Sequence, residues 1–186
     1  MVILTTALAV LLTGSLVYCV LVVVATRRFL SSTLPASGTQ PPISIIKPLC
    51  GHDDGLEENL RSFCVQDYPE YEVLFAVHRQ DDPAVAVAEK IINEFRGRIN
   101  AQLIITGESP IPNAKAFSLN RLVREASYDV LVMTDSDVRV TPSLLSHLAQ
   151  EFQDERIGLS SCPYRAMPGK SFWSRLEAIG MNTELL

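Results

Sequence analysis

The chain has 186 residues, which is enough for one domain with a substantial core. Apolar residues make up 47% of it and charged residues 20%, so the apolar content has to be concentrated in part of the chain. A net charge of −5 without a block of Lys or Arg argues against a nucleic-acid-binding protein, whose affinity would depend on phosphate neutralisation. The composition also excludes the collagen-like, disordered and disulfide-scaffold classes.

The apolar residues are concentrated at the N-terminus. Residues 2–25 carry no charged side chain and could cross a hydrocarbon core about 30 Å thick as a helix. The alternative, a cleaved signal peptide, would have basic residues before a shorter apolar stretch. We therefore expect a single-pass transmembrane anchor. Because Arg27 and Arg28 directly follow it, the positive-inside bias predicts that the rest of the chain lies on the cytoplasmic side.

Residues 26–42, rich in Ser, Thr and Pro, are expected to form a flexible linker to a domain over residues 43–186. This domain alternates short apolar runs with helical periodicity, which is typical of an α/β fold with a mostly parallel sheet and flanking helices. Strands are expected at residues 43–46, 72–77, 103–105, 130–133 and 157–161, the fourth fully buried. Helices are expected at residues 54–64, 82–95, 115–126, 141–152 and 171–186, with caps at Asp54, Asp82 and Thr141.

Acidic pairs follow three of the expected strands, at the edge where ligands bind to an open parallel sheet. They are Asp53 with Asp54, Asp81 with Asp82, and Asp135 with Asp137. Neighbouring carboxylates repel each other unless a cation or a hydrogen-bond donor satisfies them. The pattern therefore indicates a metal or a polyhydroxyl ligand at this edge.

The segment Asp135-Ser136-Asp137 is the strongest of these signals. In an extended backbone, residues i and i+2 point to the same side, so both carboxylates can bind one cation. Mg²⁺ and Mn²⁺ use one or two carboxylates and complete their coordination with phosphate and water. The segment therefore suits a metal–diphosphate complex, and the alternative is an acidic turn whose side chains only accept hydrogen bonds from loop amides.

The other candidates also have structural interpretations. Asp54 and Asp82 are both explained by helix capping, and Lys115 is either a phosphate ligand or an ordinary loop lysine. The apolar stripe from Phe172 to Ile179 is either packing surface or a lipid-facing helix. The chain lacks GxGxxG, GxxxxGK[ST] and GxSxG motifs. It therefore does not carry the usual sequence motifs of dinucleotide-binding proteins, P-loop nucleotide hydrolases or serine hydrolases.

The order of segments resembles a known family. ISIIKPLCG, NLRSFCVQDYPEYEVLFAV, DDPA, a loop ending in NAK and VLVMTDSDVRV resemble the ceramide glucosyltransferases and their bacterial hopanoid-associated relatives. These are inverting enzymes of the GT-A fold, a Rossmann-like α/β architecture, and the likeness runs from about Ile43 to Tyr164. The resemblance implies a membrane-anchored enzyme that transfers a sugar from a UDP-sugar to a lipid hydroxyl, with Mn²⁺ or Mg²⁺.

The resemblance also implies roles for individual residues. Asp82 matches the position that contacts the uridine nucleotide, and Asp135 matches the next functional aspartate. Asp137 matches the metal-binding partner of DxD glycosyltransferases, and Lys115 matches a lysine that precedes the DxD strand. Ala116-Phe117-Ser118 replaces the polar, Asn-rich segment that often follows this lysine.

The family carries, further along, an acidic general base and a Q/RxxRW motif. Trp173, the single tryptophan, lies in SFWSR and matches neither, so the catalytic base is not identified and the chain looks like an N-terminal, donor-binding fragment. Two other functions remain open: a non-catalytic, membrane-tethered nucleotide-sugar-binding module, and a nucleotidyltransferase-like enzyme that uses the same metal site.

Overall fold

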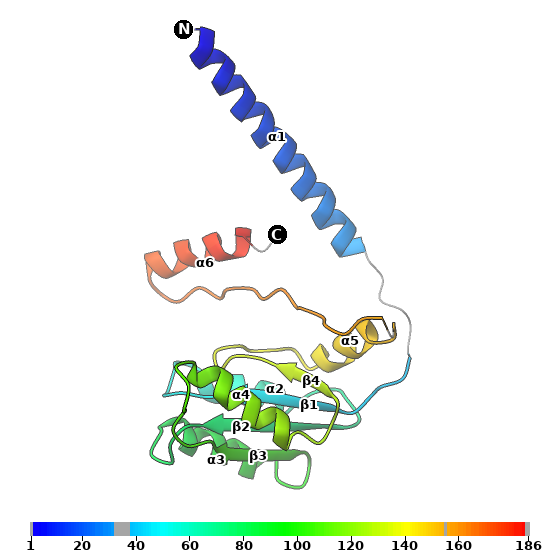
Figure 1. The fold of residues 1–186 in the computed structure, drawn as a ribbon, viewed down its shortest axis with the longest axis vertical. Coiled ribbons are helices and arrows are strands. Elements are labelled where there is room, and N and C mark those ends of the chain that lie inside the picture. The colour runs from blue at the N-terminus through cyan, green and yellow to red at the C-terminus, as the bar shows by residue number, and fades with distance from the viewer. Residues whose placement is uncertain (1, 32–37, 155, 185–186) are drawn as a thin grey trace. The chain divides into compact units, whose positions relative to one another are not determined.

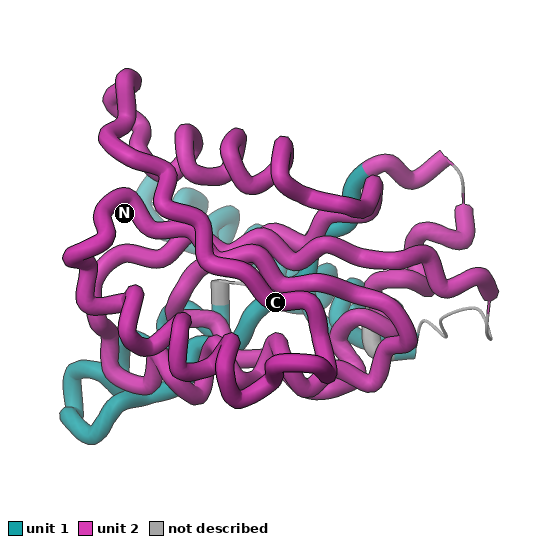
Figure 2. The backbone as a smooth tube through the Cα atoms, turned by 90° about the horizontal axis from the view of Figure 1, so that it is seen from below, with its two compact units in different colours: residues 1–34, 159–186 teal, residues 35–158 magenta. Residues whose placement is uncertain are grey.

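The computed structural model describes residues 2–31, 38–154 and 156–184, and the chain divides into two compact units (Figure 2). One unit contains residues 35–158, and the other contains residues 1–34 and 159–186. The first unit holds the parallel sheet that the sequence predicts, with strand order β3-β2-β1-β4 (Figure 1). Its strands are β1 (Ile43–Pro48), β2 (Tyr71–Val77), β3 (Asn100–Ile105) and β4 (Val130–Met133).

Helices cover both faces of this sheet, which gives a three-layer α/β fold. The helices of this unit are α2 (Leu56–Phe63), α3 (Ala84–Glu94), α4 (Ala114–Glu125) and α5 (Leu144–Glu151). The larger core cluster joins α2, α3 and α5 to one face of the sheet, and a smaller cluster joins α4 to the other. This arrangement confirms the predicted fold class.

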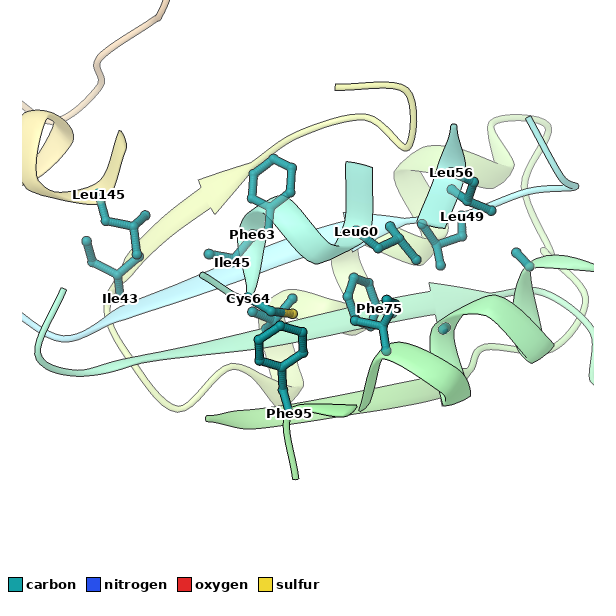
Figure 3. Packing of buried hydrophobic residues seen from close by; sticks show 14 of the residues in the cluster. Ile43, Ile45, Leu49, Leu56, Leu60, Phe63, Cys64, Phe75, Phe95 and Leu145 are labelled. Atoms are coloured by element: carbon teal, nitrogen blue, oxygen red, sulfur yellow. The ribbon is translucent and has the colours of Figure 1, made fainter. Parts of the chain in front are cut away.

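The two central strands are apolar on both faces because helices cover both sides of them. In the larger cluster, Figure 3 shows Ile43 beside Leu145 of α5, Ile45 beside Phe63 of α2 and Phe75 below Leu60. On the other face, the buried residues of the smaller cluster are Ile46, Leu74, Ala76 and Leu122. At about 25 cal/mol per Å² of apolar area, burial on both faces is the main stabilising contribution to this sheet.

A polar network around the buried Glu72 joins the amino-terminal ends of the strands. The fully buried Glu72 carboxylate accepts hydrogen bonds from Ser44 Oγ at 2.6 Å and Asn100 Nδ2 at 3.0 Å. Its other donors are the backbone N–H and hydroxyl of Ser127, at 2.6 and 3.0 Å. Ser44, Glu72 and Asn100 lie in register across β1, β2 and β3, so this network fixes the α4–β4 connection to the sheet.

Strand β4 differs from the prediction of a fully buried strand. Val130 and Val132 pack against the larger core cluster, but Leu131 is 36% and Met133 63% exposed. In the described sheet β4 is an edge strand, and α4 packs on β1 and β2. The predicted strand at residues 157–161 is also wrong: these residues join no ladder, and Leu159 is 88% exposed.

Two of the predicted helix caps are wrong. Helix α2 begins after Gly55, which has a φ of 80° and no side-chain cap, so Asp54 does not cap it. Helix α5 begins after Ser143, also without a side-chain cap, although the carbonyl of Thr141 accepts the N–H of Leu144. Gly55 adopts a left-handed backbone conformation, which allows the chain to turn sharply into α2 without a capping side chain.

Two further helices belong to the other unit. Helix α1 (Val2–Ser31) contains one candidate membrane span, Val2–Arg28, and extends six residues into the predicted linker. Residues 32–37 of that linker lie outside the described residues, and residues 38–42 form neither helix nor strand. Helix α6 (Phe172–Glu184) confirms the last predicted helix, of which residues 185–186 are not described, and its Phe172, Trp173, Leu176 and Ile179 side chains are exposed.

Candidate active site

The acidic segment after β4 lies at the switch point of the sheet. From β1 the chain proceeds to β2 and β3 on one side, and it then returns through α4 to place β4 on the other side. The carboxyl ends of β1 and β4 therefore border the crevice in which open α/β sheets bind ligands. Residues 134–137 directly follow β4 at this edge, and residues 49–55 follow β1.

Lys115 and Asp135, which the sequence places 20 residues apart, form an ion pair. Lys115 lies in the first turn of α4, whose N-cap Asn113 accepts the N–H of Ala116 at 3.0 Å. Its Nζ is 2.5 Å from Oδ1 of Asp135, and about half of each side chain is exposed. The predicted site residues are Asp82, Lys115, Asp135 and Asp137, and the structure brings Lys115 and Asp135 into direct contact. Asp137, two residues further along the same turn, is also exposed.

A buried lysine lies beneath this turn. Lys47 of β1 is fully buried, and its Nζ donates to Thr134 Oγ1 at 3.1 Å and to the carbonyl oxygen of Asp135. The same Nζ lies 4.1 Å from the ring centroid of Phe63, within cation–π range. Burial lowers the pKa of Lys47 to about 7, although the charges of Asp137 and Asp135 act in the opposite direction.

A second buried side chain holds the same turn from α2. Asn59 donates from Nδ2 to the carbonyl oxygen of Ser136 at 3.4 Å, and its Oδ1 accepts from Arg139 Nε at 3.1 Å. Within the turn itself, the N–H of Val138 donates to the carbonyl of Asp135 at 3.4 Å. The backbone of the acidic turn is thus bound from β1 and from α2, while the Asp135 and Asp137 side chains are exposed.

Asp82 connects the loops that follow β2 and β1. Its Oδ1 accepts from the N–H of Ala84, the first residue of α3, at 2.8 Å, as the capping interpretation predicts. The same carboxylate accepts the N–H of Gly51 at 3.0 and 3.2 Å. Gly51 has a φ of 71°, a backbone conformation that L side chains rarely adopt, so a glycine suits this position.

Asp81, the neighbour of Asp82, is neutralised within its own loop. Arg79 donates to both of its carboxylate oxygens, at 2.8 and 2.7 Å, and holds the pKa of Asp81 below its usual range. Arg79 and Asp81 line an open hollow of about 380 Å³ together with His78, Ile105 and Glu108. Donors from the protein therefore bind both carboxylates of the Asp81–Asp82 pair.

The charged side chains of the acidic turn that could bind a cation are those of Asp135 and Asp137. Among the described residues, no group of three or more His, Cys, Asp or Glu side chains could hold a metal. Two exposed carboxylates on one turn still fit Mg²⁺ or Mn²⁺, because these cations complete their coordination with phosphate and water oxygens. The donor set thus fits a cation that arrives with a diphosphate better than a permanently bound ion.

Lys47 and Asn59 are not among the site residues that the sequence predicts. A charged residue inside an otherwise apolar strand is a signal that could have identified Lys47, because a buried lysine needs hydrogen-bond partners. Asn59 carries no such signal, since its spacing on α2 is that of an ordinary helix residue. Both contacts join segments more than 70 residues apart, and only the folded structure shows them.

Comparison with known proteins identifies the family. The profile described as glycosyl transferase family 21 matches residues 6–186, which is nearly the whole chain. Ceramide glucosyltransferase 1 of Caenorhabditis elegans is 29% identical over 128 residues, or 68% of this chain and 27% of that protein. Ceramide glucosyltransferase of Komagataella phaffii is 32% identical over 119 residues, or 61% and 23%. The chain thus spans about a quarter of these relatives.

Solved structures share the fold at low sequence identity. A mannosyltransferase, PcManGT from Pyrobaculum calidifontis in complex with GDP-Man and Mn²⁺, aligns with a TM-score of 0.63 and 23% identity, over 79% of this chain and 43% of that one. S. aureus TarS in complex with UDP aligns with a TM-score of 0.50 and 19% identity, over 67% and 39%. These similarities confirm the predicted GT-A-like architecture.

Proposed function

The chain belongs to glycosyl transferase family 21, and we propose that it binds a metal-complexed UDP-sugar for transfer of the sugar to a lipid hydroxyl. The observation that carries this proposal is the Asp135–Asp137 turn at the switch point of the sheet, with Lys115 beside it. The names of the relatives support a lipid acceptor such as ceramide. The GDP-Man, Mn²⁺ and UDP complexes of the structural neighbours support a nucleotide-sugar donor with a divalent cation.

Each residue at the crevice has a proposed task. Asp135 and Asp137 would hold Mn²⁺ or Mg²⁺, which when bound neutralises the charge on the leaving UDP. Lys115 would exchange its ion pair with Asp135 for a contact with a phosphate oxygen. Asp82 would contribute to the uridine side by fixing the loop at Gly51, since its carboxylate accepts two backbone N–H groups.

The membrane setting completes the proposal. Helix α1 carries a span of 27 residues with mean hydropathy 2.6, which would tether the domain to the bilayer that contains the acceptor. Arg27 and Arg28 at its end favour a cytoplasmic domain, where a soluble UDP-sugar is available.

Titration of UDP with and without Mn²⁺ tests the site. Asp135→Asn and Asp137→Asn are each expected to weaken Mn²⁺-dependent UDP binding at least 10-fold and to leave the unfolding midpoint nearly unchanged, because both side chains are exposed. Asp129→Asn is the matched control, because it removes the same charge just before the amino end of β4, at the opposite edge of the sheet. Unchanged affinity in both site variants would contradict the metal role.

A further inference from the structure

The backbone of the acidic turn is held by two buried side chains, those of Lys47 and Asn59. The Nζ of Lys47 contacts Thr134 Oγ1, the carbonyl of Asp135 and the ring face of Phe63, which gives each of its three N–H groups a partner. Asn59 contacts the next carbonyl, that of Ser136. Two consecutive carbonyls of the turn are therefore bound from inside the domain.

The burial of Lys47 at this position costs free energy, because its amine is removed from water. Lys47 is fully buried near the carboxyl end of β1, on the face that packs against α2, where an apolar side chain would avoid the burial of an amine. Both of its described polar partners belong to residues 134 and 135. Both partners accept hydrogen bonds, which the N–H groups of Lys47 can donate in either protonation state.

The binding of the turn determines where its carboxylates point. With the carbonyls of Asp135 and Ser136 held toward β1 and α2, the Asp135 and Asp137 side chains remain exposed at the edge of the sheet. A turn without these contacts would have to be ordered when the ligand binds, and the lost backbone freedom would weaken binding. Preorganised carboxylates avoid this loss.

We propose that Lys47 and Asn59 are positioning residues that fix the Asp135–Asp137 turn for the metal–diphosphate complex, without touching that complex themselves. This inference rests on the proposed function, because it takes the turn as the metal site. It adds two residues, 77 and 88 positions away from their partners in the sequence, to the machinery of the site.

Two measurements on the full chain in detergent test the proposal. The first is amide hydrogen exchange of the peptide covering residues 134–139 in the absence of ligand, which reports the order of the turn. The second is the affinity for UDP at saturating Mn²⁺. Lys47→Met is expected to speed exchange of this peptide at least 10-fold and to weaken UDP binding about 10- to 100-fold. Asn59→Ala, which removes one longer hydrogen bond, is expected to weaken binding about 3- to 10-fold.

Gln66→Ala is the matched control. Gln66 is a buried amide like Asn59, and its Nε2 donates to the carbonyl of Thr141 at 3.1 Å, outside the acidic turn. The control is expected to lower the unfolding midpoint but to leave UDP affinity and exchange at residues 134–139 unchanged. This contrast separates a positioning role from a general contribution to stability.

The outcomes separate the two proposals. If the wild-type chain shows no Mn²⁺-dependent UDP binding, the proposed function fails and this inference fails with it. If the wild type binds but Lys47→Met and Asn59→Ala bind as tightly, only the positioning role is overturned. If Lys47→Met does not fold, Asn59→Ala decides: weaker binding and faster exchange of the turn at an unchanged unfolding midpoint support the proposal, and unchanged binding overturns it.

Discussion

Lys115→Met should have opposite effects on the metal and on the nucleotide. Lys115 Nζ lies 2.5 Å from Oδ1 of Asp135 and therefore pairs with a carboxylate that the proposed cation needs. Removal of the lysine frees this carboxylate and also removes a positive charge that repels the cation. The same substitution removes the proposed ligand of the diphosphate. Mn²⁺ alone should bind more tightly to the variant, whereas UDP should bind more weakly in the presence of Mn²⁺.

The sizes of the two effects follow from exposure and charge. Both side chains are about half exposed, at 55% and 54%, and exposed ion pairs contribute about 0.2–1 kcal/mol. The gain in Mn²⁺ affinity should therefore be at most about 5-fold. A charge-assisted hydrogen bond from lysine to phosphate is worth about 1.5–3 kcal/mol, so UDP affinity should fall about 10- to 100-fold.

Calorimetric titration of Mn²⁺, and then of UDP at saturating Mn²⁺, measures both constants. Lys90→Met is the matched control, since Lys90 is 61% exposed and pairs with Glu57 at 2.7 Å, away from the crevice. This control carries the same loss of charge and should change neither constant. If Lys115→Met weakens Mn²⁺ binding, or leaves both constants unchanged, the proposed exchange of partners is wrong.

Three further predictions concern stability, thiol reactivity and topology. Glu72→Ala should lower the unfolding free energy in denaturant titrations by about 1.5–3 kcal/mol, because it leaves the buried Ser44 hydroxyl without its acceptor and removes the partly buried hydrogen bonds from Asn100 and Ser127. Burial raises the pKa of the Cys64 thiol to about 12, so an aromatic disulfide reagent at pH 8 should modify exposed Cys50 and leave Cys64 unreacted until the domain unfolds. A cleavable tag fused after Leu186 should resist external protease in intact cells, because Arg27 and Arg28 favour a cytoplasmic domain; cleavage would reverse the orientation.

The sequence predicted the elements of the sheet well where burial determines the pattern. Strands β1 and β2 are covered on both faces, so their apolar runs are continuous and easy to recognise. The expected end of the first strand at Ile46 is two residues too early, because the charged Lys47 and the proline Pro48 interrupt the apolar run. The folded structure compensates Lys47 with partners that the strand pattern does not contain.

The wrong predictions of burial and of helix capping also depend on contacts and backbone geometry that the sequence pattern does not contain. An apolar run such as residues 130–133 looks the same in a central strand and in an edge strand, so the exposure of Met133 could not be predicted. On α4 the apolar Val123 is 47% exposed, whereas the small polar Ser118 is buried. Asp54 has the residue type of a cap, but the backbone of Gly55 decides where α2 begins.

The contact between Lys115 and Asp135 follows from topology. In a strand–helix–strand unit, the helix runs antiparallel to the strand that follows it, so the start of α4 and the end of β4 lie at the same edge of the sheet. The contact between Lys47 and Thr134 depends instead on register: Ile46 lies opposite Met133, which places the next residues of the two strands side by side. A shift of one residue would turn Lys47 toward the other face. The motif thus predicts which residues would bind the proposed ligand, and the register of β1 with β4 determines which buried side chain contacts their backbone.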